Sequence, residues 1–483
     1  MMTAMPEAPA IRYGTAQGRW VIVAAVLGSG VVFLDGTVVN VALPAISRDL
    51  HASVRGLQWM LDGYLVTLSS LLLLGGSAGD RYGRRRVFVA GLAGFVAASV
   101  LCGFAPGVGF LIAARALQGV AGALLVPASL SIISSGFEPS DRGRAIGAWS
   151  GLAAVAGAAG PLLGGWLVDA ASWRFIFFLN VPLAAAAVAI AQRHVPETSD
   201  DEAGPLDVTG ASLVSLGTAL VAYALIEHGR GSASVVVGLA GIAALAAFVA
   251  VERRGDQPML PLSLFESRQF TGANLATFAV YGAMSAAIFL VVLRLQVTLG
   301  YSALEAGMSL LPFTGLMLAL SARIGALAQR IGPRLPMTVG PLLSAGGLLL
   351  FSRVGPGDHY AGAVFPAVAV FGLGMTTTVA PLTSAVLAAV DSRRAGVASG
   401  VNNAAARLAG LLGIAVIPAL AGIGSGAGLA GSLDHGYGAA LRISAAVCAA
   451  GGAVSWLFVR EAAPVRTVTH PSPLHACHDS SVA

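Results

Sequence analysis

Residues 75–86 read GGSAGDRYGRRR and lie between two long apolar segments. Within them, residues 80–86 hold four arginines and one aspartate, and such charges are costly in the hydrocarbon of a membrane. The stretch therefore predicts a tight hairpin between two membrane helices, held on the cytoplasmic side by its arginines. Its glycines allow the two helix ends to approach closely. The plainer alternative is an ordinary positive-inside loop, which the placement of the glycines and the aspartate argues against.

The composition is that of an integral membrane protein. Of 483 residues, 56% are hydrophobic and 11% are charged, whereas soluble domains average about 25% charged. All 28 basic residues are arginines dispersed through short loops, so the net charge of +5 indicates membrane topology and not nucleic-acid binding. Because a Walker-type phosphate loop requires a lysine, we do not expect ATP hydrolysis.

The three cysteines are too few for a disulfide framework. Cys102 and Cys448 fall in apolar segments, which predicts inert buried thiols. Cys477 stands beside His475 and His478 in a polar tail, but this spacing matches no closed metal site, and such tails are generally disordered. We therefore expect no metal and no cofactor other than protons as the coupling ion.

Fourteen segments are long enough to cross a bilayer, since a membrane helix needs about 20 mostly apolar residues. An even number places both termini on the same side. With this count, eighteen arginines lie in tails and loops on the side of the termini and five on the other side, which places both termini in the cytoplasm. The predicted spanners are 20–42, 57–77, 87–105, 109–131, 145–168, 175–191, 207–227, 233–251, 271–294, 304–323, 335–353, 361–385, 396–422 and 437–460.

A weak internal repeat divides the chain into halves. GALAQRIGPR at 325–334 follows the tenth spanner as residues 75–86 follow the second, if spanners seven and eight are an insertion. Duplicated halves are typical of secondary transporters. The predicted units are a cytoplasmic tail without a signal peptide (1–19), a first six-helix bundle (20–191), a linker with two extra spanners (192–270), a second six-helix bundle (271–460) and a disordered cytoplasmic tail (461–483).

Three charged residues of the first half lie well inside spanners: Asp35, Asp62 and Arg115. At 1.5 Å per residue they lie roughly 10, 8 and 9 Å from the outer ends of three different helices. Because unpaired buried charges are costly, we expect them to meet, without saying which aspartate pairs with Arg115. Burial favours a neutral carboxyl and a nearby arginine favours the carboxylate, so the group could bind and release a proton. The alternative is a static pair that only orients helices.

Several stretches carry motifs that occur in a fixed order. They are LDGTVVNVALPAI (34–46), WMLDGYLVTLSSLLLLGGSAGDRYGRRR (59–86), RALQGVAGALLVPAS (115–129), AGAAGPLLGGWL (156–167), WRFIFFLNVP (173–182) and LGYSALEAGMSLLP (299–312). Together they resemble the fourteen-spanner drug:proton antiporters (EmrB/QacA type) of the major facilitator superfamily, over most of residues 20–460. Ala156 departs from the glycine usual in this family. The resemblance implies the major facilitator fold, and it implicates Arg115 in proton coupling.

By resemblance, the loop after the second spanner is a conformational latch between the halves. Its residues would be Gly76, Asp80, Arg81, Gly83 and Arg84. The carboxylate of Asp80 would be favoured beside a helix N-terminus. The alternative for Asp80 is simple solvation at the lipid headgroups.

The fifth-spanner motif contains Gly160, Pro161, Gly164 and Gly165. Proline removes a backbone donor and kinks a helix, and small residues permit close helix packing. A bent, closely packed helix between the halves could seal the path against proton leak, and by resemblance this is the antiporter motif. The alternative is the glycine packing common in membrane helices.

Substrate-binding residues are the least defined by the sequence, since no spacing isolates them. Arg407 could meet an anionic substrate, and Asp62 is the best candidate for contact with a cation. Further candidates for lining a central cavity are Asn40, Tyr64, Gln118, Tyr281, Asn402 and Asn403.

The sequence thus predicts an all-α polytopic membrane protein of the bacterial inner membrane that acts as a monomer. It would exchange an amphipathic drug or secondary metabolite for protons by alternating access. A proton symporter of a small nutrient is the alternative among transporters, and the fifth-spanner motif argues against it. A receptor or scaffold without transport is the alternative from another class. An enzyme is not expected, because no ligand cluster or nucleophile arrangement is present.

Overall fold

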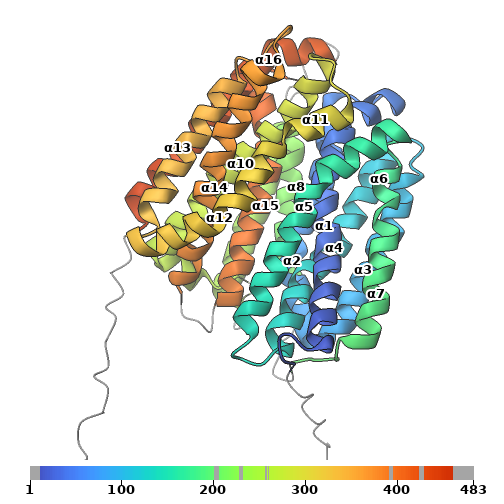
Figure 1. The fold of residues 1–483 in the computed structure, drawn as a ribbon, viewed down its shortest axis with the longest axis vertical. Helices are drawn as coiled ribbons and strands as arrows, with labels where there is room; N and C mark the ends of the chain where they lie inside the picture. The colour runs from blue at the N-terminus through green and yellow to red at the C-terminus, as the bar shows by residue number, and fades with distance from the viewer. Residues whose placement is uncertain are drawn as a thin grey trace, which may run out of the picture.

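The structure is a computed structural model, and it describes residues 11–200, 206–227, 232–255, 258, 260–390, 395–423 and 429–460. Within these ranges the helices are joined by turns and irregular loops, and the one β-type pairing is an isolated bridge between Ile11 and Phe137. Fourteen segments are long and apolar enough to cross a membrane (Figure 1), which confirms the predicted fold class and number of spanners. The predicted C-terminal tail lies outside the described residues, as does the Cys477 group.

The first six spanners form one bundle. α1 packs against α5 and α7, while α4 packs against α2 and α3. Side-chain caps start two of the helices: the Thr15 hydroxyl accepts from the Gly18 amide at 3.0 Å, and the Ser53 hydroxyl accepts from the Gly56 amide at 3.3 Å. The bounds are α1 (Ala16–Asp49), α2 (Val54–Tyr82), α3 (Arg84–Gly103), α4 (Val108–Gly136), α5 (Arg142–Ala170), α6 (Phe175–Phe178) and α7 (Asn180–His194).

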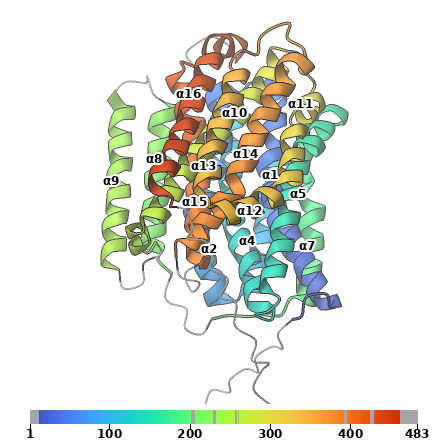
Figure 2. The ribbon, with the colours of Figure 1, turned by 60° about the vertical axis from the view of Figure 1, so that its left-hand side comes forward.

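Two linker helices precede the second bundle. α8 (Val208–Ile226) and α9 (Ser232–Arg254) pair with each other at one edge (Figure 2), and α8 also packs against α2 and α15. In the second bundle α10 packs against α15 and α16, and α13 packs against α14 and α16. The bounds are η1 (Leu262–Glu266), α10 (Arg268–Val297), α11 (Ala303–Ser309), α12 (Leu311–Ile331), α13 (Arg334–Phe351), η2 (Tyr360–Val364), α14 (Phe365–Ala388), α15 (Ala395–Leu420) and α16 (Leu429–Phe458).

The helices differ from the predicted spanners in length and continuity. α1 runs over Ala16–Asp49, beyond the predicted 20–42, because hydropathy marks only the apolar part of a helix whose hydrogen bonding continues into polar ends. The sixth and tenth spanners are each interrupted shortly before a proline, Pro182 and Pro312, and the twelfth changes from π-helix to α-helix just before Pro366. Proline has no amide donor, so it is tolerated in the first turn of the helix that follows each break.

Gly83 alone separates α2 from α3, so residues 75–86 do contain a turn between two membrane-length helices. Its φ of +101° lies in the left-handed region, where glycine is favoured because it has no Cβ. Cys102 and Cys448, the other positions of interest in the apolar segments, are free and buried.

The two bundles touch differently at the two ends of the molecule. We call the end where α1 begins and α16 ends the tail end, and the opposite end the far end. Glycines show how closely neighbouring helices approach, because an added Cβ would meet whatever lies beside them. Along α5, a Cβ added at Gly143, Gly147 or Gly151 would have no atom of a neighbouring segment within 4 Å. At Gly165, near the far end, a Cβ would lie 2.5 Å from Leu304 Cα of α11. The bundles are therefore in close contact at the far end, while α5 is open at the tail end.

Candidate functional site

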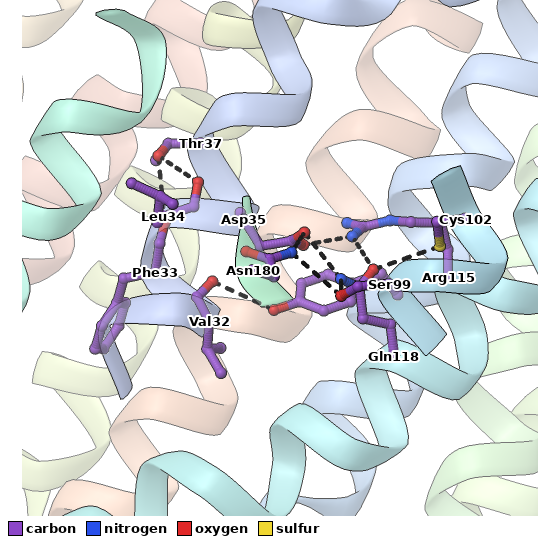
Figure 3. A network of polar contacts seen from close by, with 12 residues as sticks. Val32, Phe33, Leu34, Asp35, Thr37, Ser99, Cys102, Arg115, Gln118 and Asn180 are labelled. Atoms are coloured by element: carbon purple, nitrogen blue, oxygen red, sulfur yellow. Dashed lines mark hydrogen bonds and ion pairs between the residues drawn. The ribbon is translucent and has the colours of Figure 1, made fainter. Parts of the chain in front are cut away.

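Asp35 of α1 and Arg115 of α4 form an ion pair inside the first bundle (Figure 3). The Asp35 side chain is 0% exposed and that of Arg115 is 1% exposed. The sequence left open which aspartate pairs with Arg115, and the structure identifies Asp35. Separating α1 from α4 would leave each of these buried charges without its partner, which is costly. The ion pair therefore holds the two helices together.

The Asp35 carboxylate also accepts hydrogen bonds from two side-chain amides. Gln118 Nε2 lies 2.9 Å from Asp35 Oδ1, and Asn180 Nδ2 lies 3.1 Å from the same oxygen. Both amides also donate to the Ser99 hydroxyl, at 2.9 and 3.2 Å, and Arg115 donates to Gln118 Oε1 at 2.6 Å. Four helices, α1, α3, α4 and α7, thus supply one network (Figure 3). Ser99 and Asn180 were not singled out in the sequence, and Gln118 lies in this network instead of facing an open space.

Tyr64 of α2 covers one face of the Arg115 guanidinium. The Arg115 Cζ lies 4.1 Å from the Tyr64 ring centroid and 5.9 Å from that of Phe177, within the range of cation–π attraction. The Tyr64 hydroxyl donates to the Val32 carbonyl at 3.4 Å. Tyr64 is 1% exposed, so it supports the ion pair from within the first bundle.

Asp62 does not join this network, so the expectation that all three charges meet is wrong for Asp62. Tyr64 points to Arg115. Asp62 is two residues before Tyr64, and side chains two residues apart on a helix differ by about 200° in direction, so Asp62 points away from Arg115. Asp62 instead shares a face of α2 with Gln58, which donates to the Ile414 carbonyl of α15 at 2.8 Å. Asp62 is 0% exposed, and in the described part of the chain neither carboxyl oxygen has a hydrogen-bond partner.

The two aspartates therefore have opposite surroundings. An anion at Asp35 is balanced by a guanidinium and two amide donors. An anion at Asp62 would be buried without any partner, which costs several kcal/mol, and a neutral acid avoids most of that cost. One carboxyl group is thus fully paired, while the other has no polar partner among the described residues.

The loop between α2 and α3 holds the segment that follows α7. Arg84 Nε donates to Asp80 Oδ1 at 2.9 Å, and the Arg84 amide donates to the Thr198 carbonyl at 2.9 Å. Glu197, which the sequence did not single out, accepts from the Arg85 amide at 3.0 Å. A Cβ at Gly83 would lie 2.7 Å from Glu197 Oε1, so glycine gives this carboxylate its room.

The other predicted latch residues lie on the same hairpin. A Cβ at Gly76 would lie 3.5 Å from Pro127 Cβ of α4, and the Arg81 guanidinium lies 5.8 Å from the Tyr82 ring centroid. The partner of Asp80 is the side chain of Arg84, the first residue of α3. These contacts are within the first bundle and the following segment, and a latching role toward the second bundle stays a prediction.

The fifth-spanner motif packs α5 against both bundles. A Cβ at Gly160 would lie 3.1 Å from the Leu34 carbonyl oxygen, and one at Gly164 would lie 2.9 Å from that of Val38. These glycines therefore let α5 lie directly on α1. A Cβ at Gly165 would lie 2.6 Å from the Ala303 carbonyl oxygen of α11. Gly165 therefore lets α5 lie directly on α11 as well.

Pro161 belongs to the same contact, because a Cβ at Gly307 of α11 would meet the Pro161 carbonyl oxygen. Asp169, at the far end of α5, accepts hydrogen bonds from the Ala303 and Leu304 amides at 3.2 and 2.8 Å. An acidic side chain at the first amides of a helix is stabilising. The fifth spanner therefore closes the far end by packing and by hydrogen bonds.

Two glutamines complete the far-end closure. Gln296 of α10 donates to the Val41 carbonyl of α1 at 2.9 Å. Gln58 of α2 donates to the Ile414 carbonyl of α15 at 2.8 Å. Beyond this layer lies a cavity of about 410 Å³. Its lining includes Arg48, Asp169, Gln296, Tyr301 and Glu305.

The remaining cavity candidates are spread over both bundles. Asn40 is half-buried and donates to the Gly36 carbonyl of its own helix at 3.2 Å. Asn402 donates to Asn274 Oδ1 at 3.1 Å and to Thr277 Oγ1 at 2.8 Å, inside the second bundle. Asn403 is exposed.

Arg407 of α15 is half-buried and crosses toward the first bundle. Its Cζ lies 5.5 Å from the Phe33 ring centroid on α1. Within the described ranges, no group of three His, Cys, Asp or Glu side chains could hold a metal ion. The chemistry available between the bundles is therefore that of carboxyl groups, arginines, amides and aromatic rings.

Comparison with known proteins gives consistent results. The family model described as Major Facilitator Superfamily matches residues 25–414. The chain is 35% identical to a probable actinorhodin transporter of Streptomyces coelicolor, over 84% of this chain and 74% of that protein. It is 36% identical to a puromycin resistance protein of Streptomyces alboniger, over 92% and 90%. Among solved structures, the peptide transporter POT in complex with sulfate has a TM-score of 0.68 at 14% identity, covering 92% of this chain and 94% of that one. That likeness shows the fold alone.

Proposed function

The chain belongs to the major facilitator superfamily, and on that premise we propose that it exports small amphipathic molecules, such as antibiotics or secondary metabolites, in exchange for protons. It is a multi-pass membrane transporter and not an enzyme. The two relatives named above are a probable actinorhodin transporter and a puromycin resistance protein. Both names fit removal of a drug from the cell.

The observation that carries the coupling proposal is the contrast between the two buried aspartates. Asp35 is fully paired, whereas Asp62 is buried at the bundle interface without a hydrogen-bond partner among the described residues. We propose that Asp62 carries a proton in this conformation. The Asp35–Arg115 pair then holds α1, α4 and α7 in their present positions until the conformation changes.

The closed far end and the open tail end fit one step of alternating access. Arginines are concentrated in the loops at the tail end, so we place that end in the cytoplasm and the protein in the bacterial inner membrane. The structure then corresponds to the inward-open conformation. Substrate would enter from the cytoplasmic side, and opening of the α5–α11 contact would release it outside. We further propose that a monomer suffices, that no cofactor besides the proton is used, and that nucleic acid is no partner.

The test is proton movement in inverted membrane vesicles energised with a proton gradient. Addition of puromycin or actinorhodin should dissipate part of the gradient, as read by a pH-sensitive dye. Asp35→Asn should abolish this response, since it removes the charge that balances Arg115, while Asp35→Glu should retain part of it. Asp358→Asn is a matched control, because Asp358 is exposed in a far-end loop.

Protein levels in the vesicles must be equal for the comparison to count. Unchanged dissipation in the Asp35→Asn variant would remove Asp35 from the mechanism. No response to any compound of a broad panel would favour a receptor or scaffold. Uptake of a nutrient together with protons would favour a symporter.

A further inference from the structure

Arg407 is a cation at the interface between the bundles, and it has no acidic partner among the described residues. The other arginines of the helical interior are paired: Arg115 with Asp35, and Arg294 with Asp434 near the far end. For Arg407, no hydrogen bond or ion pair occurs in the described part of the chain. Because this half-buried guanidinium has its charge unbalanced by any described acidic group, it is suited to receive an anion.

One aromatic ring lies beside Arg407, and two tyrosines on other helices lie within range of its charge. Its Cζ lies 5.5 Å from the Phe33 ring centroid on α1. It also interacts electrostatically with the hydroxyl groups of Tyr64 on α2 and Tyr281 on α10. Together with α15, these elements come from both bundles. A ligand bound here would therefore contact both halves of the transporter.

The face of α1 opposite Arg407 is only partly covered by other side chains. Phe33, Gly36 and Asn40 recur at helical spacing and are all half-buried, whereas the adjacent Leu34 and Asp35 are buried. At Gly36 a Cβ would meet one atom within 4 Å, Arg407 Nη1 at 4.0 Å. The guanidinium thus faces a helix surface on which the central position has no side chain.

We propose that Arg407 binds the anionic group of a planar aromatic substrate. A carboxylate can pair with the guanidinium through two parallel N–H donors, a geometry for which arginine is suited and lysine is not. The aromatic part of the substrate would lie against Phe33 and Tyr281. This assignment of a substrate class rests on the proposed function, since it concerns what the exporter carries.

Tyr64 lies between this site and the Asp35–Arg115 network. Its ring lies 4.1 Å from the Arg115 Cζ, and its hydroxyl interacts electrostatically with both Asp35 and Arg407. An anion that pairs with Arg407 changes the electrostatic potential at Tyr64 and, through it, at the Asp35–Arg115 pair. Substrate binding would then act on the ion pair that joins α1 to α4.

The test measures binding to the purified full-length protein by equilibrium dialysis. The probes are anthraquinone-2-carboxylate and its uncharged carboxamide, which share one ring system. The wild-type protein should bind the acid at least tenfold more tightly than the amide. Arg407→Gln should abolish this preference by weakening acid binding at least tenfold with amide binding unchanged, and Arg407→Lys should give an intermediate result. Arg323→Gln is the matched control, since Arg323 is exposed on α12 and its loss should leave the preference intact.

Three results would overturn the proposal. One is equal binding of acid and amide by the wild-type protein. Another is a preference that persists in Arg407→Gln. The third is no binding of any acid when the naphthalene and anthracene analogues are added to the panel. If Arg407→Gln does not fold, as judged by its thermal transition, Arg407→Lys decides: binding equal to that of the wild-type protein would contradict a paired carboxylate.

Energised inverted vesicles separate this proposal from the proposed function. Proton movement driven by neutral or cationic aromatic compounds, with none driven by the acids, would leave proton-coupled export standing and overturn the anion site. Acid binding that depends on Arg407, without proton movement for any compound, would support the anion site and contradict proton-coupled export.

Discussion

A methyl group at Gly165 should open the far end of the transporter. The Cβ of Gly165→Ala would lie 2.5 Å from Leu304 Cα and 2.6 Å from the Ala303 carbonyl oxygen, whereas ordinary contacts begin near 3.4 Å. These are backbone atoms of α11, so no side-chain rotation can relieve the overlap. The two helices must separate by roughly 0.9 Å, the difference between 3.4 and 2.5 Å.

Overpacking of this kind costs about 1–3 kcal/mol. The penalty applies only to the conformation in which α5 and α11 touch, so the population should shift toward far-end-open molecules by about 5- to 150-fold. Gly147→Ala is the matched control on the same helix, because a Cβ there has no atom within 4 Å. It should leave the population unchanged.

A cysteine at Gly36 reports the shift. Gly36 lies on the tail side of the Gln296–Val41 contact, so a membrane-impermeant maleimide applied from the far end reaches it only when the far end opens. The three native cysteines are first replaced by serine. Gly165→Ala should raise the labelling rate at least fivefold, and Gly147→Ala should change it less than twofold. Equal labelling in both variants, with both proteins folded, would refute the closure assigned to Gly165.

Two further changes test the network and the hairpin. Asn180→Ala removes one donor to the Asp35 carboxylate. Because hydrogen bonds to charged groups are worth about 1.5–3 kcal/mol, the midpoint temperature of thermal unfolding should fall. An unchanged midpoint would show that the bond contributes nothing to stability. Glu197→Gln removes the charge beside Arg85 and Arg86. Trypsin should then cleave the hairpin between α2 and α3 up to about fivefold faster, in line with the modest stabilisation that half-exposed ion pairs give. Cleavage at the wild-type rate would contradict a role of Glu197 in holding this hairpin.

Much of the fold follows from hydropathy, because a helix that crosses hydrocarbon must be long and apolar. The breaks before Pro182 and Pro312 and the change of helix type before Pro366 were not predicted, since mean hydropathy is insensitive to backbone donors. Each break has a local signal nevertheless, in the proline that begins the new helix.

The candidate site was only partly predictable, for a geometric reason. The depth of a residue in the membrane follows from its position along a spanner, and this brought Asp35 and Arg115 together correctly. The direction in which a side chain points depends on how each helix is rotated, and depth says nothing about rotation. Asp62 therefore lies on another face of α2, toward α15.

Neutral polar residues were the other omission. Ser99 and Asn180 complete the Asp35 network, and Gln58 and Gln296 join the two bundles. Uncharged side chains are common within membrane helices, so nothing in the sequence marks these four. A proton-coupling group needs such donors around it, and that requirement is the signal that could have identified them.

The central claim, that Asp62 holds the exchanged proton, can be measured directly. Purified protein in weakly buffered detergent solution is mixed with a substrate identified in the vesicle assay, and proton release is followed with a pH indicator. The account predicts release of about one proton per bound substrate by the wild-type protein and none by Asp62→Asn, with substrate binding retained. Equal proton release by the two proteins would contradict it.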